Sequence, residues 1–266
     1  MNNSENRPLA AVTGASSGIG FELAKELARR GYDLAIAAED AGIKDAARDI
    51  EQDGAIVTPV QVDLANYDGV EKFYAELKAI GRPVDVIAIN AGVGVGGDFA
   101  RETELDKEIK LINLNVTSSV HLAKRVLKDM VDRHEGRVLF TSSIAGAAPG
   151  PREAVYAASK AFLFSFSEAL RNELKDTGVT VTALLPGPTE TNFFHRAEMD
   201  DTKVGQSEKD DPAEVARQGV EALLDGRDRV VAGSFKNKLF VAAGRLAPET
   251  AAEMHRKQAE PVSADS

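Results

Sequence analysis

The stretch Leu9–Arg30, LAAVTGASSGIGFELAKELARR, decides the fold of this chain. A short apolar run, Leu9–Thr13, leads into three glycines in the spacing G-x-x-x-G-x-G, and an amphipathic helical pattern begins at the second glycine. Glycines at a strand-to-helix turn let the backbone approach a phosphate closely, and the helix N-terminus offers free N–H groups to it. The alternative is a tight turn without a ligand. The pattern favours dinucleotide binding by Gly14, Ser16, Ser17, Gly18, Ile19 and Gly20.

Short apolar runs alternate with longer amphipathic segments along most of the chain. We expect strands at Leu9–Thr13, Leu34–Ala38, Ile56–Val62, Val84–Asn90, Arg137–Thr141, Val179–Leu185 and Arg229–Ala232. We expect helices at Gly18–Arg30, Ile43–Gln52, Tyr67–Ala79, Glu104–His134, Ala154–Lys175 and Pro212–Asp225. Nearly continuous apolar strands in such an alternation are typical of a parallel sheet with helices on both faces. The sequence therefore predicts an α/β Rossmann fold, a doubly wound parallel sheet of about seven strands.

The same rhythm indicates one domain, residues 8–235, after an N-terminal tail of residues 1–7. Within it, Pro188–Asp211 is polar except for two phenylalanines and interrupts the alternation. Residues 236–266 form a C-terminal extension that we expect to be partly disordered, above all in its last residues, QAEPVSADS.

The composition excludes several classes of function. A net charge of −10 over 266 residues disfavours a nucleic-acid partner, because binding a phosphate backbone needs a basic face. The chain has no cysteine, which excludes disulfides and thiol chemistry. No run reaches the roughly 18 apolar residues of a membrane span, and the N-terminus lacks the apolar stretch of a secretory signal. We expect a cytoplasmic protein without a membrane or nucleic-acid partner and without a metal site.

Small and polar residues follow several of the predicted strands, at the edge where open parallel sheets bind their ligands. Glu39 is placed to accept hydrogen bonds from an adenosine ribose, or is an ordinary loop charge. Asp63, followed by Leu64, is placed to reach an adenine amine or to cap the next helix, although Asn66 is the better cap. Asn90, Ala91 and Gly92 leave room for a ligand, and the turn with Pro186, Gly187, Thr189 and Thr191 offers two hydroxyls to a carboxamide.

Two asparagines, Asn113 and Asn115, stand in the apolar part of a predicted helix. Asparagine is a poor residue for a helix interior, since its amide competes for backbone hydrogen bonds. The pair predicts a local distortion of the helix that anchors something, most simply a water.

Tyr156 and Lys160 are four residues apart on a predicted helix, so both side chains lie on one face. An adjacent positive charge favours the phenolate, which brings a phenol closer to proton exchange at neutral pH. Ser143 follows the apolar run Val138–Phe140 and is placed to hydrogen-bond a carbonyl in the same crevice. Tyr74 and Lys78 have the same spacing but no serine thirteen residues upstream, and we expect that pair to be a solvated tyrosine and a surface lysine.

Together, TGASSGIG, Asp63, NAG, Asn115, Ser143, the Tyr156–Lys160 pair and PGPTET resemble the short-chain dehydrogenase/reductase family over about residues 8–235. The resemblance implies that Asn115, Ser143, Tyr156 and Lys160 are catalytic. Tyr156 then exchanges a proton with the substrate oxygen, Lys160 holds the nicotinamide ribose and lowers the phenol pKa together with the oxidised nicotinamide, and Asn115 positions a water. It also implies that Pro188–Asp211 is a substrate lid.

The resemblance favours an NAD(P)-dependent oxidoreductase that interconverts a small-molecule secondary alcohol and a ketone. A non-catalytic dinucleotide-binding regulator, and an epimerase or dehydratase, remain alternatives. NAD is predicted over NADP because Glu39 stands where NADP-preferring members often carry arginine. The family commonly forms dimers or tetramers through the Glu104–His134 and Ala154–Lys175 helices, so we expect a homodimer or homotetramer. Small residues that permit close approach of two such helices are Ala157, Ala161, Ser165 and Ala169.

Overall fold

The structure, a computed structural model, describes residues 7–262 apart from the side chain of Arg245. Seven strands form one parallel sheet in the order β3-β2-β1-β4-β5-β6-β7. The strands are β1 (Leu9–Thr13), β2 (Asp33–Ala38), β3 (Val57–Gln61), β4 (Val84–Ile89), β5 (Gly136–Thr141), β6 (Val179–Pro186) and β7 (Arg229–Ala232). The chain reverses its direction of winding between β1 and β4, so the predicted doubly wound sheet is confirmed.

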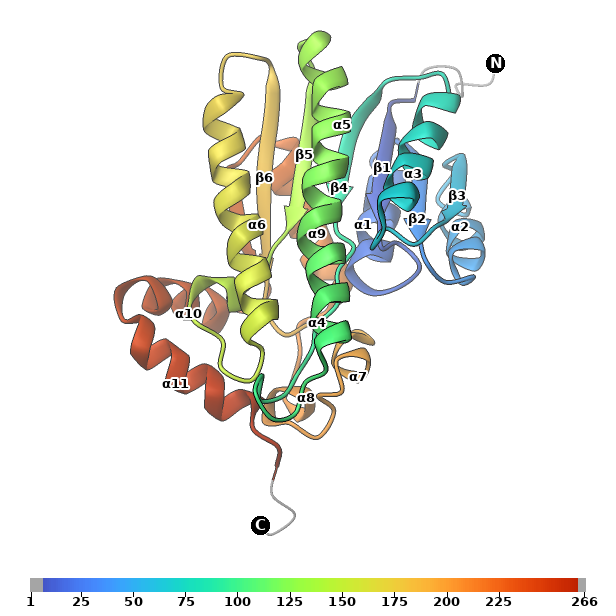
Figure 1. The fold of residues 1–266 in the computed structure, drawn as a ribbon. Helices are drawn as coiled ribbons and strands as arrows, with labels where there is room; N and C mark the ends of the chain where they lie inside the picture. Colours follow the sequence, from blue (N-terminus) through green and yellow to red (C-terminus); the bar gives the residue numbers. More distant parts are fainter. Residues whose placement is uncertain (1–6, 263–266) are drawn as a thin grey trace.

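Helices cover both faces of the sheet (Figure 1). One apolar cluster joins the sheet to α1 (Gly18–Arg29), α2 (Ile43–Glu51) and α9 (Pro212–Leu224). A second cluster, on the other face, joins it to α3 (Tyr67–Ala79), α5 (Ser118–Asp132) and α6 (Ala154–Glu173). The central strands are buried on both faces, which explains why their sequences are apolar without alternation.

The predicted helix 104–134 is interrupted. It consists of α4 (Leu105–Ile112), a π-helical turn at Asn113–Thr117, and α5. A single π turn inside a helix widens it locally and is frequent at functional sites. The distortion expected from the two asparagines is therefore present, and it carries Asn115 into the interior, where the residue is fully buried.

Four further helices gather at the end of the sheet where the strands finish (Figure 1). They are α7 (Phe193–Arg196), α8 (Lys203–Gln206), α10 (Phe235–Leu246) and α11 (Pro248–Ala259). The expectation of disorder is wrong for residues 258–262, since helix α11 extends to Ala259 and the Val262 N–H donates to the Asp201 carbonyl at 2.8 Å. Residues 263–266 of that stretch, and residues 1–6 of the predicted N-terminal tail, lie outside the described residues.

Helix α6 exposes only part of the small-residue face that was expected. Ser165 and Ala169 are exposed, but Ala161 is half-buried and Ala157 has 3% of its surface exposed. The prediction was wrong for Ala157, which packs against Gly150 of the preceding turn. The exposed side of the helix also carries a bulky residue, Phe162. None of the described helices combines the length and the apolar character that crossing a membrane requires.

Candidate active site

A cavity of about 960 Å³ opens along the carboxyl ends of the strands. It is large enough for an extended cofactor together with a small substrate. Every residue predicted to bind the dinucleotide lines it, and so do Ser143, Tyr156 and Lys160 among the predicted catalytic residues. These cofactor candidates are Gly14, Ser16, Ser17, Gly18, Ile19, Gly20, Glu39, Asp63, Leu64, Asn90, Ala91, Gly92, Tyr156, Lys160, Pro186, Gly187, Thr189 and Thr191. Asn115 is buried behind the wall.

The glycine turn needs its glycines. Gly14 has a φ of 68°, in the left-handed region, and a Cβ there would lie 2.9 Å from the Ala91 Cα. A Cβ on Gly20 would lie 2.1 Å from the Gly14 carbonyl oxygen and 2.5 Å from the Asn90 Nδ2. Asn90 in turn donates to the Thr13 carbonyl, which ties the end of β4 to the end of β1. The glycines thus allow the turn to close tightly at the switch point of the sheet.

The start of helix α1 suits a pyrophosphate. Its N-cap residue, Ser17, makes no side-chain hydrogen bond to the first turn, so the first N–H groups of the helix stay available to an anion. Gly92, on the opposite wall, leaves space where a Cβ would lie 3.1 Å from the Asn115 Oδ1 and 3.3 Å from the Lys160 Nζ. The residues present therefore fit a dinucleotide that runs from α1 towards Lys160.

Two carboxylates stand where the adenosine ribose is expected. Asp40 accepts a hydrogen bond from the Ser16 hydroxyl at 2.7 Å. Glu39 forms an ion pair with Lys110 of α4, at 3.3 Å, with both side chains about half exposed. Lys110 follows Glu39 by 71 residues, and the sequence analysis did not identify it.

Asp63 accepts a hydrogen bond from the Ala65 N–H at 2.8 Å, and Asn66 caps α3 by accepting from the Gly69 N–H. The helix cap is therefore Asn66, as predicted. This leaves the Asp63 carboxylate at the cavity wall, beside the buried Leu64.

Asn115 holds the chain that follows β4. Its Nδ2 donates to the Val93 carbonyl and to the Ser159 hydroxyl, both at 3.0 Å, and its Oδ1 accepts from the Val93 N–H at 2.9 Å. Both donors of the amide are thus used by protein groups, and the side chain fixes the cavity wall next to Lys160. That Asn115 also positions a water stays a prediction.

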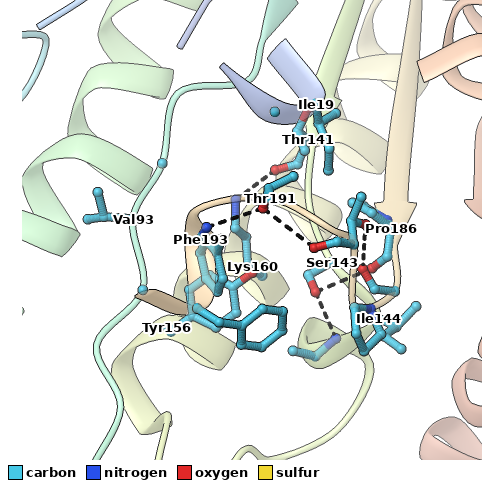
Figure 2. Close-up of a pocket in the computed structure, with 18 of the residues that line it drawn as sticks. Ile19, Val93, Thr141, Ser143, Ile144, Tyr156, Lys160, Pro186, Thr191 and Phe193 are labelled. Carbon is cyan, nitrogen blue, oxygen red and sulfur yellow. Dashed lines mark hydrogen bonds between the residues drawn. The ribbon is translucent and has the colours of Figure 1, made fainter. Parts of the chain in front are cut away.

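Ser143, Tyr156 and Lys160 face the same part of the cavity (Figure 2). Ser143 follows β5, accepts from the Ala145 N–H at 3.1 Å and caps a short 3-10 turn. The Lys160 ammonium lies 5.7 Å from the centre of the Tyr156 ring and donates to the Thr141 carbonyl at 2.9 Å. Tyr156 and Lys160 are 8% and 4% exposed, so both side chains are nearly withdrawn from water.

Burial dominates the ionisation of both groups. It raises the pKa of the Tyr156 phenol well above its ordinary value; the Glu153 carboxylate adds to this rise, and a hydrogen bond with Ser143 opposes it. Burial lowers the pKa of Lys160 from 10.5 to about 8. Without a cofactor, Tyr156 is therefore a protonated phenol. The expected lowering of its pKa, which relies partly on the oxidised nicotinamide, is not present in this state.

The second tyrosine–lysine pair belongs to the scaffold. The Tyr74 hydroxyl and the Lys78 ammonium both bind the Asp129 carboxylate of α5, at 2.8 Å and 3.2 Å. Burial, with the hydrogen bond to Asp129, raises the pKa of Tyr74 to about 12. Tyr74 is partly buried against the sheet and is not simply solvated, as we had expected. Neither residue lines the cavity, so this pair links α3 to α5.

The segment predicted as a lid covers the catalytic group. Thr189 and Thr191 line the cavity, and the Phe193 N–H donates to the Thr191 hydroxyl at 3.2 Å. The Phe193 ring then packs against Tyr156, with 5.2 Å between ring centres (Figure 2). Gly94 admits this ring, since a Cβ on Gly94 would lie 2.5 Å from it.

Sequence reasoning missed a further pair at the cavity wall. Glu153, three residues before Tyr156, binds His255 of α11, with 2.9 Å between the carboxylate Oε2 and the ring Nε2. Both residues line the cavity. The only sequence signal was a histidine in a polar tail, one of four in the chain, and this does not reveal a partner 102 residues away.

Known proteins resemble this chain in both sequence and structure. A model of the short chain dehydrogenase family matches residues 8–202. An uncharacterized short-chain type dehydrogenase/reductase of Sinorhizobium fredii is 38% identical over 71% of this chain and 73% of its own length. A short-chain dehydrogenase from Sphingobium yanoikuyae, solved in complex with NADPH, superimposes with a TM-score of 0.80 at 29% identity, covering 97% of this chain and 98% of that one. The bulky-bulky ketone specific alcohol dehydrogenase from Comamonas testosteroni gives a TM-score of 0.76 at 26% identity, covering 92% and 95%.

Proposed function

The chain belongs to the short-chain dehydrogenase/reductase family, and from this premise we propose that it interconverts a secondary alcohol and a ketone with a nicotinamide dinucleotide. The observation that carries the proposal is the grouping of Ser143, Tyr156 and Lys160 on the wall of one cavity, beyond the glycine turn. The solved relative from Comamonas testosteroni, whose name describes a ketone-specific alcohol dehydrogenase, supports the same reaction class.

In this mechanism the bound cofactor supplies or accepts the hydride. Ser143 and Tyr156 hydrogen-bond the substrate oxygen from one side of the cavity. In reduction Tyr156 gives its proton to the developing alkoxide, and in oxidation it takes the proton from the alcohol. Lys160 donates to the nicotinamide ribose and stabilises the phenolate. A pKa of about 8 makes the Lys160 ammonium a stronger acid than a free lysine, so the ammonium can pass a proton to the Tyr156 phenolate near neutral pH.

The alternative is a regulator that binds the dinucleotide without catalysis. A sensor has no use for a buried proton donor beside a buried lysine, because burying two ionisable groups costs stability. The proton-transfer group therefore favours an enzyme. Within residues 7–262 no separate substrate domain follows β6, and this arrangement disfavours an epimerase or dehydratase.

NAD is the cofactor that we propose, ahead of NADP. Glu39 and Asp40 both line the ribose end of the cavity, where the 2′-phosphate of NADP would meet two carboxylates. Ser16, which could otherwise donate to that phosphate, already donates to Asp40. Lys110 offers one positive charge, but Glu39 pairs with it. One observation favours NADP instead: the Sphingobium relative was solved in complex with NADPH.

A homodimer or homotetramer is the proposed assembly. Helix α4 exposes Leu105 and Ile109, and α6 exposes Phe162, with 71%, 47% and 41% of their surfaces accessible. Apolar side chains gathered on two neighbouring helices are typical of an interaction surface. The proposed face keeps the exposed Ser165 and Ala169 and adds Phe162.

The experiment is a panel of ketones and secondary alcohols, followed by the absorbance of the reduced nicotinamide, with NAD(H) and NADP(H) in parallel. Turnover of at least one pair supports the reaction class. Tyr156→Phe removes the proton donor and is expected to lower kcat about 10²–10⁴-fold while the cofactor still binds. Tyr74→Phe is the matched control and retains the wild-type rate. A Tyr156→Phe rate within threefold of wild type contradicts the assigned role.

A further inference from the structure

The C-terminal helix α11 contributes directly to the substrate end of the cavity. His255 of α11 binds Glu153 at 2.9 Å, and the Arg152 Nε donates to the Ala259 carbonyl at 3.1 Å. These contacts fix α11 against the turn that leads into the catalytic helix α6. Met254, His255 and Gln258 of α11 line the same cavity as Tyr156.

Apart from Glu153, the surroundings of Tyr156 are largely apolar. Tyr156 belongs to a cluster with Leu111, Ala145, Val93, Val95, Val155 and Phe193. Glu153 is the N-cap residue of α6 and precedes Tyr156 by three residues, and both side chains line the cavity. The carboxylate is close enough to contribute to the raised pKa of Tyr156. Besides Ser143 and Lys160, a carboxylate thus stands near the proton donor, next to an apolar cluster.

One oxygen of the Glu153 carboxylate is open to a bound molecule. The Glu153 side chain is 8% exposed, and the His255 side chain is 11% exposed. Oε2 binds the histidine, whereas within residues 7–262 no hydrogen bond reaches Oε1. Oε1 is not one of the fully buried polar atoms that lack a partner, so it remains accessible to a hydrogen-bond donor. Since Glu153 lines the cavity, a bound substrate is placed to supply the second donor.

We propose that Glu153, held in place by His255, binds a hydrogen-bond donor of the substrate next to its carbonyl. The inference rests on the proposed ketone–alcohol reaction and names its substrate class: ketones that carry a neighbouring hydroxyl or protonated amine, and the corresponding diols or amino alcohols. Glu153 selects the substrate, and His255 is a positioning residue. The alternative is an ion pair that only anchors α11.

The test compares four ketones that share one skeleton: acetophenone and its α-hydroxy, α-methoxy and α-dimethylamino derivatives. The methoxy compound keeps the polarity of the hydroxy compound but has no donor. A hydrogen bond to a charged group is worth about 10–100-fold, so wild type is expected to prefer the hydroxy over the methoxy ketone in kcat/KM by that factor. Preference for the hydroxyl or for the protonated amine identifies the donor.

Glu153→Leu is expected to reduce this preference to within threefold. The preference is a ratio of kcat/KM values for two ketones in the same variant, so a general change in turnover cancels. Glu153→Gln keeps an acceptor for His255, retains part of the hydroxyl preference and loses the preference for the amine. Thermal unfolding shows whether each variant is folded. If Glu153→Leu is not, Glu153→Gln still tests the role of the carboxylate. His255→Gln, whose amide can donate to Glu153, keeps the preference, and His255→Leu lowers it.

Glu102→Gln is the matched control. Glu102 binds Arg152, the residue before Glu153, at 2.7 Å, but Glu102 does not line the cavity. It is expected to leave the preference unchanged. Equal preferences in wild type and Glu153→Leu, with good turnover, overturn the inference and leave the proposed function intact. Absence of turnover on every ketone and alcohol of both panels overturns the proposed function itself.

Discussion

Lys160→Met should change how the stability of the cofactor-free protein depends on pH. Lys160 is 4% exposed, and burial lowers its pKa from 10.5 to about 8. The difference corresponds to about 3 kcal/mol of unfavourable free energy for the charged form in the folded protein. A methionine of similar length carries no such cost.

The direction of the effect follows from proton binding. Below pH 8 the lysine is charged in both the folded and the unfolded chain, so the full burial cost is present. Between pH 8 and 10.5 the folded protein has lost the proton and the unfolded chain still holds it, so the cost is relieved as pH rises. Wild type therefore gains stability relative to Lys160→Met across this window, by up to about 3 kcal/mol.

The absolute difference at pH 7 is smaller, because the substitution also removes the hydrogen bond from Lys160 to the Thr141 carbonyl, worth about 1.5–3 kcal/mol for a charged donor. The slope against pH is thus the informative quantity. Urea unfolding at pH 7, 8, 9 and 10 would measure it, with Lys78→Met, a lysine 59% exposed on α3, as the control. If the free energies of unfolding of wild type and Lys160→Met change in parallel over this pH range, while both proteins unfold in two states, the burial argument is refuted.

Three further outcomes are expected. Wild type should bind NAD(H) more tightly than NADP(H), as both dissociation constants would show. Glu39→Arg should tighten NADP(H) by up to about fivefold, since one exposed ion pair is worth up to about 1 kcal/mol. Tighter NADP(H) binding by wild type contradicts the carboxylate argument. Phe193→Ala should admit water to Tyr156 and lower its raised pKa, so the fall of the reduction rate with pH moves to lower pH; an unchanged kcat/KM profile would show that Phe193 does not shield the phenol. Phe162→Glu should dissociate the oligomer in sedimentation experiments, whereas the exposed Phe235→Glu, on α10, should not.

The sheet was predictable because burial on both faces leaves a direct trace in the sequence. Strand β2 is apolar at five of six positions and lies within one residue of the predicted range. The glycine turn was equally readable, since Gly14 and Gly20 have no substitute that fits. Asn115 signalled the π turn because its amide is out of place in an apolar helix. Each of these features is local in the chain.

The orientation of α6 was not predictable from the same kind of pattern. Alanines occur at 154, 157, 158, 161 and 169, so small residues lie on several sides of the helix. Only the neighbours decide which side is covered, and Gly150 packs against Ala157 from the preceding turn. Helix α11 was missed for a related reason. Ala251 and Ala259 are its buried residues, and two alanines give no apolar periodicity.

The contacts that the sequence did not reveal are those that we expect to distinguish this chain from its relatives. In the proposed mechanism, proton transfer needs Ser143, Tyr156 and Lys160 at fixed spacings near one strand and one helix, so their pattern is readable along the chain. Glu153 meets His255 across 102 residues, and Glu39 meets Lys110 across 71. These encounters depend on where separate helices are placed by the fold, and no spacing rule encodes them. Substrate choice is therefore the part of function for which the folded structure is required. For the cofactor, the sequence supplied Glu39 and the fold added its partner, Lys110.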